Sequence, residues 1–199
     1  MIRRIEIDEL KSLYKSLIKK DFPRNERRPY QAIKKLHRTG RYACLVLEEE
    51  GRILAYASFI LAYEISSILL DYFAVDGKYQ GEGIGSQLLS YVSEYWVDKA
   101  GIIIECETPE SARTENEKSQ RERRINFYIR GGAINTPVRW RIFGVNYRVL
   151  WLPIDPNRVQ PDVACDLTGL YSLAVPKALR PRVARILMRS ISETIPKEP

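Results

Sequence analysis

Hydrophobic residues along the chain follow two spacings, one typical of amphipathic helices and the other typical of strands. Near the beginning, leucine, tyrosine and isoleucine recur at helical spacing behind Asp8, a residue type that caps helices. The first half predicts helices over residues 8–18 and 30–37, a hairpin over 42–48 and 52–63, and a strand over 67–75. The second half predicts a helix that follows Gly81, Gly83 and Gly85 and ends at Gly101, a strand over 102–107, a loop over 108–120, a helix over 121–130, and strands over 138–143 and 147–152.

The order of these elements predicts an α/β protein whose mixed sheet is covered by helices. After Pro153 and Pro156 the hydrophobic pattern becomes irregular, so we expect one domain over residues 1–154 and a C-terminal extension over residues 155–199. Residues 177–199 contain six basic and two acidic residues and contribute +4 to the total charge of +7. Apolar residues in this segment stand at helical spacing between arginines, which predicts a basic amphipathic helix.

A basic amphipathic helix is able to contact nucleic acid, an anionic membrane or an acidic partner. Ordinary surface helices have the same pattern. We therefore expect this helix to dock its apolar side on the domain and leave its arginines in water, which makes nucleic acid the less favoured partner.

The composition excludes several classes of protein. With 199 residues, 45% of them hydrophobic and 29% charged, the chain is too apolar to be disordered. Its longest apolar stretch, residues 53–63, is shorter than the ~20 residues of a membrane-spanning helix, and the charged first residues do not resemble a secretory signal. Its three cysteines form no close pair, so we expect neither a disulfide framework nor a metal site. We expect a cytoplasmic protein.

The turn between the strand at 67–75 and the following helix is the most informative segment for function. Three glycines lie where the helix begins, and there the first backbone N–H groups have no helical partner and the helix dipole is positive. Glycine also lets a ligand approach the backbone, so we expect an anion such as a phosphate to bind here. The glycine spacing matches neither the Rossmann fingerprint nor a P-loop, which excludes those two nucleotide motifs.

The residues of this turn, Gln80-Gly81-Glu82-Gly83-Ile84-Gly85, resemble the Gln/Arg-x-x-Gly-x-Gly/Ala signature of the GNAT N-acetyltransferase superfamily. The preceding Phe73-Ala74-Val75 resembles the end of that family's central strand. A second block, residues 127–133, is similar to the family's helix that ends in Tyr-x-x-x-Gly-Phe, with Ala133 in place of the aromatic residue. The two blocks stand in the family's order and spacing, and the resemblance extends over residues 1–152.

The resemblance implies a mixed, largely antiparallel sheet with a splayed central parallel pair of strands and helices on both faces. It also implies acetyl-CoA as cofactor. Backbone N–H groups of the turn would bind the pyrophosphate of coenzyme A, the pantetheine arm would pair with the end of the central strand, and an N–H of Phe73 or Val75 would polarise the thioester carbonyl. The candidate cofactor-binding residues are Phe73, Ala74, Val75, Gln80, Gly81, Glu82, Gly83, Ile84, Gly85 and Ser86.

The chemistry of acyl transfer assigns roles to further residues. Transfer from a thioester to an amine needs a base for the amine and an acid for the departing thiolate, and Tyr128 matches the family tyrosine that protonates the thiolate. The family's glutamate on the central strand is replaced by Leu69. Asp71 points to the same face as Leu69, and Glu105 and Glu107 share one face of the next strand. Each of these three carboxylates is a candidate base acting through water and also a candidate structural carboxylate.

Other residues receive smaller roles. Arg121 stands where the family commonly has an asparagine that contacts the cofactor, so that contact is either missing or made by a guanidinium. Residues between the first two helices border the family's acceptor site and are candidates for gripping an acidic acceptor, namely Glu26, Arg27, Arg28 and Tyr30. We expect His37 to be exposed and Cys106 to lie in the core.

The sequence therefore predicts an N-acetyltransferase that moves an acetyl group from acetyl-CoA to a primary amine by direct attack in a ternary complex. The acceptor is a small molecule or a protein amino group, and the protein is a monomer or a homodimer. The missing carboxylate at Leu69 leaves one alternative, a non-catalytic acyl-CoA-binding or regulatory module of the same fold.

Overall fold

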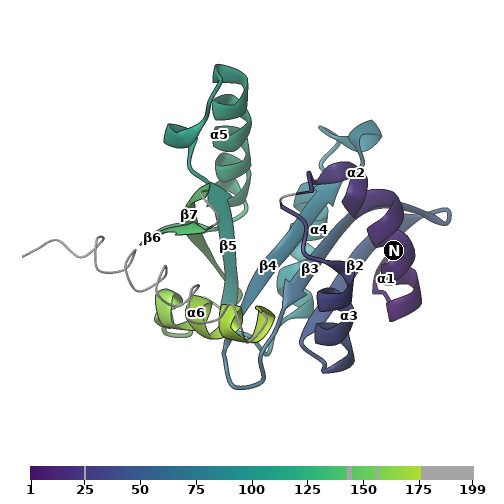
Figure 1. The fold of residues 1–199 in the computed structure, drawn as a ribbon, viewed down its shortest axis with the longest axis horizontal. Coiled ribbons are helices and arrows are strands. Elements are labelled where there is room, and N and C mark those ends of the chain that lie inside the picture. The colour runs from purple at the N-terminus through teal and green to yellow at the C-terminus, as the bar shows by residue number, and fades with distance from the viewer. Residues whose placement is uncertain (25, 143–144, 156, 176–199) are drawn as a thin grey trace, which may run out of the picture. The chain divides into compact units, whose positions relative to one another are not determined.

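Strand β4 (Ser67–Val75) is shared by two units of the chain. The N-terminal unit comprises Met1–Leu61 and Leu70–Tyr95, and the C-terminal unit comprises Ala62–Leu69 and the chain from Trp96 onward. The computed structural model describes residues 1–24, 26–142, 145–155 and 157–175 of the 199-residue chain (Figure 1). The basic helix predicted over 177–199 lies outside these described residues.

The strands follow the order β1-β2-β3-β4-β5-β7-β6 in one sheet. The pairs β1–β2, β2–β3, β5–β7 and β6–β7 are antiparallel, whereas β4 and β5 are parallel. The parallel register joins Ser67, Ile68 and Leu69 to Gly101, Ile102 and Ile103. The predicted fold class, a mixed and largely antiparallel sheet with one parallel pair and flanking helices, is confirmed.

The N-terminal unit contains the helices predicted over residues 8–18 and 30–37, the helix predicted after the glycine turn, and the predicted hairpin. Its elements are β1 (Ile2–Arg4), α1 (Ile7–Leu13), a π-helical turn (Tyr14–Ile18), α2 (Lys19–Asp21), α3 (Tyr30–Arg38), β2 (Tyr42–Glu49), β3 (Arg52–Ile60), the last six residues of β4, a 3₁₀ turn (Gly77–Tyr79) and α4 (Ile84–Tyr95). Strand β1 is an element that the hydrophobic pattern did not predict, because three residues are too few to show alternation.

Burial explains why helices cover both faces of the strands in this unit. Six successive residues of β2, Tyr42 to Leu47, are buried, although neighbouring residues of a strand point to opposite faces. Helix α3 packs on β2, and α4 packs on β3 and β2. Figure 1 shows α3 in front of the strands and α4 behind them. Continuous apolar strands of this kind require cover on both sides.

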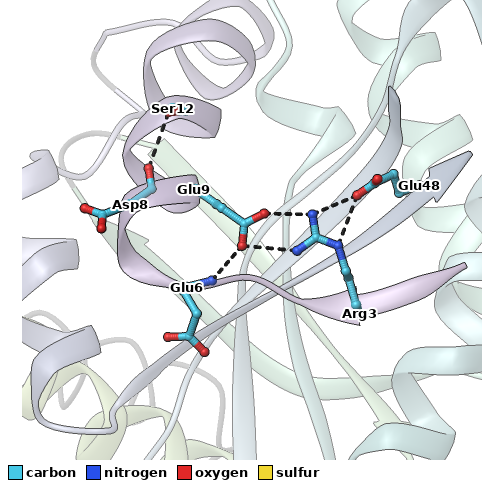
Figure 2. Close-up of polar contacts among 6 residues, drawn as sticks. All are labelled: Arg3, Glu6, Asp8, Glu9, Ser12 and Glu48. Carbon is cyan, nitrogen blue, oxygen red and sulfur yellow. Dashed lines mark hydrogen bonds and ion pairs between the residues drawn. The ribbon is translucent and has the colours of Figure 1, made fainter. Parts of the chain in front are cut away.

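Arg3 joins the first strand to the first helix and to β2 (Figure 2). Its guanidinium lies 2.7 Å from Glu9 Oε1 and 2.8 Å from Glu48 Oε2. The hydrogen bonds from Arg3 hold the pKa of the Glu9 carboxyl below its ordinary value. Glu9 also accepts a hydrogen bond from the Glu6 backbone, so the helix is capped at Glu6. The prediction that Asp8 is the cap is therefore wrong, since Asp8 lies in the first turn.

The C-terminal unit has a hydrophobic core built around β5 and β7. Its elements are the first three residues of β4, β5 (Gly101–Glu107), a 3₁₀ turn (Pro109–Ser111), α5 (Glu115–Arg130), β6 (Ile134–Ile142), β7 (Val145–Pro153) and α6 (Val163–Ala174). The first four residues of β5 are buried, as are Val149 to Leu152 of β7. The strands β5 and β7 therefore form the centre of this unit.

Helix α5 starts six residues earlier than predicted. The hydrophobic pattern missed its first turns because they are polar on all sides. The Thr114 hydroxyl accepts a hydrogen bond from Glu117 N at 3.1 Å, and the Glu117 carboxylate accepts one from Arg113 N at 2.9 Å. A threonine followed three residues later by a glutamate is a helix-start signal that stands in the sequence. The predicted loop over 108–120 is wrong for residues 115–120.

Helix α6 lies in the segment that the hydrophobic pattern left irregular. Asp162 caps it by accepting hydrogen bonds from Ala164 N and Cys165 N, both at 3.0 Å. Its buried residues recur at helical spacing and are Val163, Leu167, Leu170 and Ala174.

None of the helices in the described part of the chain is both long enough and apolar enough to cross a membrane.

Gly101 does not end a helix, contrary to the prediction. Helix α4 ends at Tyr95, and Gly101 opens β5. A Cβ atom at this position would clash with the Trp151 indole and the Leu152 carbonyl oxygen. Glycine is required here by the close approach of β7.

We expect Gly101→Ala to lower the free energy of unfolding by about 2 kcal/mol or more, because backbone and indole atoms leave no room for the methyl group. Gly77→Ala is the matched control, since a Cβ there has no neighbour within 4 Å, and it should change the stability by less than about 0.5 kcal/mol. Urea denaturation measures both values. Equal stability of the two variants would contradict the packing described for β5.

Candidate functional site

The predicted anion-binding turn connects β4 to α4 within the N-terminal unit. The turn leaves the strand at Asp76, whose backbone N–H donates to the Leu54 carbonyl at 2.8 Å. Its carboxylate then accepts from Lys78 N at 3.2 Å and starts the 3₁₀ turn. The Gln80 side-chain amide donates back to the Val75 carbonyl at 3.3 Å. The start of the turn is therefore fixed to β3 through Leu54, and Gln80 is fixed to the end of β4 through Val75.

Two residues of this turn have backbone conformations that favour glycine. Gly81 has a φ of +90° and Gly83 a φ of +82°, both in the left-handed region. A Cβ atom at either position would meet nothing within 4 Å. Glycine is thus required by the backbone path rather than by a close neighbour, and the space beside the turn is open to a ligand.

The start of α4 supplies donors to this open space. The first helical hydrogen bond of α4 runs from Gln87 N to Gly83 O at 3.0 Å. The N–H groups of Ile84, Gly85 and Ser86 precede that bond, and N–H groups at this position of a helix have no partner within the helix. Helix α4 spans 12 residues, so its dipole adds positive potential at the same end. The residues present therefore fit a phosphate or pyrophosphate group.

The end of β4 is more accessible than its beginning. Residues 67–69 are buried, whereas Phe73, Ala74 and Val75 are half-buried. These three residues belong to the same unit as the glycine turn, which follows them after five residues. The predicted cofactor residues of β4, the turn and α4 are thus parts of one continuous segment.

Tyr128 lies in the C-terminal unit, in the last part of α5. Its side chain is buried, and burial raises the pKa of the phenol well above its ordinary value of 10, with the neighbouring Cys106 acting in the same direction. The phenol therefore keeps its proton throughout the neutral pH range. Burial likewise raises the pKa of the Cys106 thiol to about 12, and this confirms that Cys106 is a core residue.

Glu105 and Glu107 point to one face of β5, and Cys106 points to the other. The Tyr171 hydroxyl of α6 donates to Glu105 Oε2 at 2.8 Å. Arg121 of α5 lies 2.5 Å from Glu107 Oε2. Arg121 also donates to the Thr108 carbonyl at 2.9 Å and to Ser111 Oγ at 3.1 Å, so it connects the end of β5 to α5.

Asp71 has donors on both carboxylate oxygens. The Arg28 guanidinium lies 3.1 Å from Oδ1, and the Tyr42 hydroxyl donates to Oδ2 at 3.0 Å. Arg28 is therefore occupied by Asp71, and Tyr30 donates to the Ile7 carbonyl at 3.4 Å. These contacts favour structural roles for two residues that the sequence made candidates for gripping an acceptor.

His37 is half-buried, so the prediction that it is exposed is wrong. Its Nε2 atom is buried and has no hydrogen-bond partner among the described residues. Burial lowers the pKa of this imidazole, and Arg4 adds to the effect. In the described ranges, no group of three or more histidine, cysteine, aspartate or glutamate residues is arranged to hold a metal ion.

The sequence did not point to Tyr171 as a member of the candidate site. The sequence indicates only the helix that carries Tyr171, through the Asp162 cap and the apolar spacing of α6. No local sequence pattern indicates the ion pair between Arg28 and Asp71, because 43 positions separate the two residues.

Comparisons with known proteins agree with this architecture. Residues 40–132 match the family model of the acetyltransferase (GNAT) domain. No curated protein sequence matches the chain. A proposed acetyltransferase of the GNAT family from Bacteroides thetaiotaomicron has 17% sequence identity and a TM-score of 0.64, with 92% of this chain and 98% of that chain covered.

Two further solved structures are similar. The ribosomal-protein-S18-alanine N-acetyltransferase from Escherichia coli has 19% identity and a TM-score of 0.57, and the match covers 80% of this chain and 99% of that chain. A proposed acetyltransferase from Salmonella typhimurium, in a structure with its cofactor acetyl-CoA, has 20% identity and a TM-score of 0.57, over 82% and 98% of the two chains. At these identities the three structures show the shared fold. The family model and the three structures agree on one likeness, a similarity of residues 40–132 to a GNAT acetyltransferase domain.

Proposed function

We propose that this protein is an acetyl-CoA-dependent N-acetyltransferase that passes the acetyl group directly to a primary amine. The observation that carries the proposal is the glycine turn before α4, where two left-handed glycines leave an open space beside the unpaired N–H groups of a helix start. Acetyl-CoA supplies the activated acetyl group as a thioester. Its pyrophosphate suits the donors of residues 81–86, because each donor is a fixed backbone N–H.

The end of β4 would bind the pantetheine arm and orient the acetyl group. The half-buried backbone of Phe73, Ala74 and Val75 continues directly into the phosphate turn, so one extended ligand can follow both. An N–H of Phe73 or Val75 would donate a hydrogen bond to the thioester carbonyl and stabilise the charge that develops on its oxygen. Orientation by backbone groups on a strand is rigid, which favours transfer in a fixed geometry.

Tyr128 is proposed as the acid that gives a proton to the departing thiolate. Burial supports this role, because the raised pKa keeps the phenol protonated at the pH of the reaction. Because the pKa of Tyr128 is raised, we also expect the plot of kcat against pH to stay flat on its alkaline side. The Tyr128 proton is retained as the pH rises to 10, the ordinary pKa of a tyrosine.

Glu105 is proposed as the base that takes the amine proton through a water molecule. Asp71 and Glu107 each contact a guanidinium, and protonation of either carboxylate would sacrifice a charge-assisted hydrogen bond. The contact between Glu105 and Tyr171 survives protonation, since a phenol can donate to the oxygen that stays unprotonated. Helix α6 would then orient the base through Tyr171.

The acceptor is proposed to be a primary amine of a small molecule or of a protein. The similar protein from Escherichia coli is named for its action on an alanine of a ribosomal protein. The alternative function is a non-catalytic acyl-CoA-binding or regulatory module. It is favoured by Leu69 at the position of the family's glutamate and by the ion pairs that hold two of the three candidate bases.

Binding of acetyl-CoA is expected with a Kd of about tens of micromolar or lower, measured by calorimetry. Gly83→Asp should weaken it at least about tenfold, because it places a negative charge at the anion site. Gly51→Asp is the matched control, since Gly51 also has a positive φ, of +74°, and open space around it in the β2–β3 turn. Absence of binding by the unchanged protein, or equal affinity of the two variants, would refute the cofactor site.

Turnover is expected with at least one member of a panel of amines, measured as release of free thiol. Tyr128→Phe and Glu105→Gln should each lower kcat by about a hundredfold or more while the Kd for acetyl-CoA stays the same. Tyr91→Phe and Glu122→Gln are controls of the same kind at exposed positions. Cofactor binding without turnover on any amine would instead support the non-catalytic module.

A further inference from the structure

Asp71 stands at the centre of a polar cluster in the N-terminal unit. Its Oδ1 atom accepts from Arg28 Nη2 at 3.1 Å and from Nε at 3.4 Å, and its Oδ2 atom accepts from the Tyr42 hydroxyl at 3.0 Å. The side chains of Arg28 and Asp71 are only 16% and 10% exposed. Hydrogen bonds between ionised groups with so little solvent access are stronger than exposed ones.

Tyr42 extends this cluster into the core. Its hydroxyl lies 2.9 Å from Ser58 Oγ as well as 3.0 Å from Asp71. A carboxylate only accepts hydrogen bonds, so the single phenol proton goes to Asp71 and the Ser58 hydroxyl can donate to the Tyr42 oxygen. Tyr42 and Ser58 are both fully buried. The hydrogen bond from the Tyr42 hydroxyl therefore fixes the orientation of the Asp71 carboxylate from the core side.

The cluster holds the backbone of Arg28 as well as its side chain. The Arg28 N–H donates to the Tyr72 hydroxyl at 2.6 Å, and the Arg28 carbonyl accepts from the Tyr14 hydroxyl at 2.9 Å. The ring of Tyr72 packs edge-on against Phe22, with centroids 4.8 Å apart. Two consecutive residues of β4, Asp71 and Tyr72, therefore fasten the segment between α2 and α3.

This anchor lies close to the proposed acetyl position. Asp71 precedes Phe73 by two residues, so their side chains share a face of β4 and their Cα atoms are about 7 Å apart along the strand. Arg28 contacts Asp71 through its guanidinium and Tyr72 through its backbone N–H, so residues 26–29 are held next to this part of β4. The segment is thus a neighbour of the strand end at which the acetyl group is proposed to lie.

We propose that Asp71 is a positioning residue, which fixes residues 26–29 beside the reaction centre through Arg28 and thereby shapes the acceptor site. The effect of Asp71 on catalysis rests on the proposed function. The anchoring of residues 26–29 does not depend on the proposed function. Asp71 is then not the general base. Its carboxylate keeps Arg28 in place throughout the reaction.

Hydrogen exchange tests the anchoring without any substrate. Asp71→Asn should raise the exchange rate of the amides of residues 26–28 about tenfold, because one charge-assisted ion pair is lost. Arg28→Lys provides a second variant, which keeps the positive charge but loses the forked contact, and it should raise the same rates. Asp155→Asn removes the exposed ion pair with Arg158 and should leave these amides unchanged. Unchanged exchange in both Asp71→Asn and Arg28→Lys would overturn the anchoring.

Steady-state kinetics with an amine found in the panel tests the role in acceptor binding. Asp71→Asn should raise the KM for the amine about tenfold, while the Kd for acetyl-CoA and the acidic side of the kcat profile stay as in the unchanged protein. Loss of the acidic side of that profile would identify Asp71 as the base and overturn the proposal. A protein that binds no acetyl-CoA would refute the proposed function instead, and the exchange rates would still decide whether Asp71 anchors the segment.

Discussion

The path of the backbone from β4 into α4 is the constraint on which the proposed chemistry depends. Gly81 and Gly83 both have positive φ, and this lets the chain reverse between a half-buried strand and a helix start within a few residues. The reversal leaves an open space next to N–H groups that have no helical partner. A side chain at either glycine would strain the turn, so its conformation and its availability to an anion have the same origin.

The three candidate carboxylates differ in the side chains that hold them. Asp71 and Glu107 are held by arginines that come from other elements, and each contact joins a strand to a neighbouring segment. Glu105 is held by a phenol of α6. The hydrogen bond from Tyr171 can persist when Glu105 takes up a proton, and for this reason we propose Glu105 as the base.

The sequence predicted the parts of the fold that show a clear period. Strand β4 and the β2–β3 hairpin have alternating or continuous β-forming residues, and α4 follows a recognisable glycine turn. The start of α5 was missed because its first turns are polar on all sides, and α6 because the preceding prolines masked its apolar spacing. The contact of Arg28 with Asp71 depends on the tertiary fold, so no local pattern contains it. The cofactor and the catalytic roles stay predictions from the resemblance and from chemistry.

We propose that the backbone of the glycine turn binds the phosphates of acetyl-CoA. Residue-resolved hydrogen exchange with and without saturating acetyl-CoA tests it most directly. The amides of residues 81–86 are expected to become protected when the cofactor binds, while the amides of the β2–β3 turn at residues 50–51 exchange at the same rate. Tight binding of acetyl-CoA that leaves the exchange of residues 81–86 unchanged would contradict it.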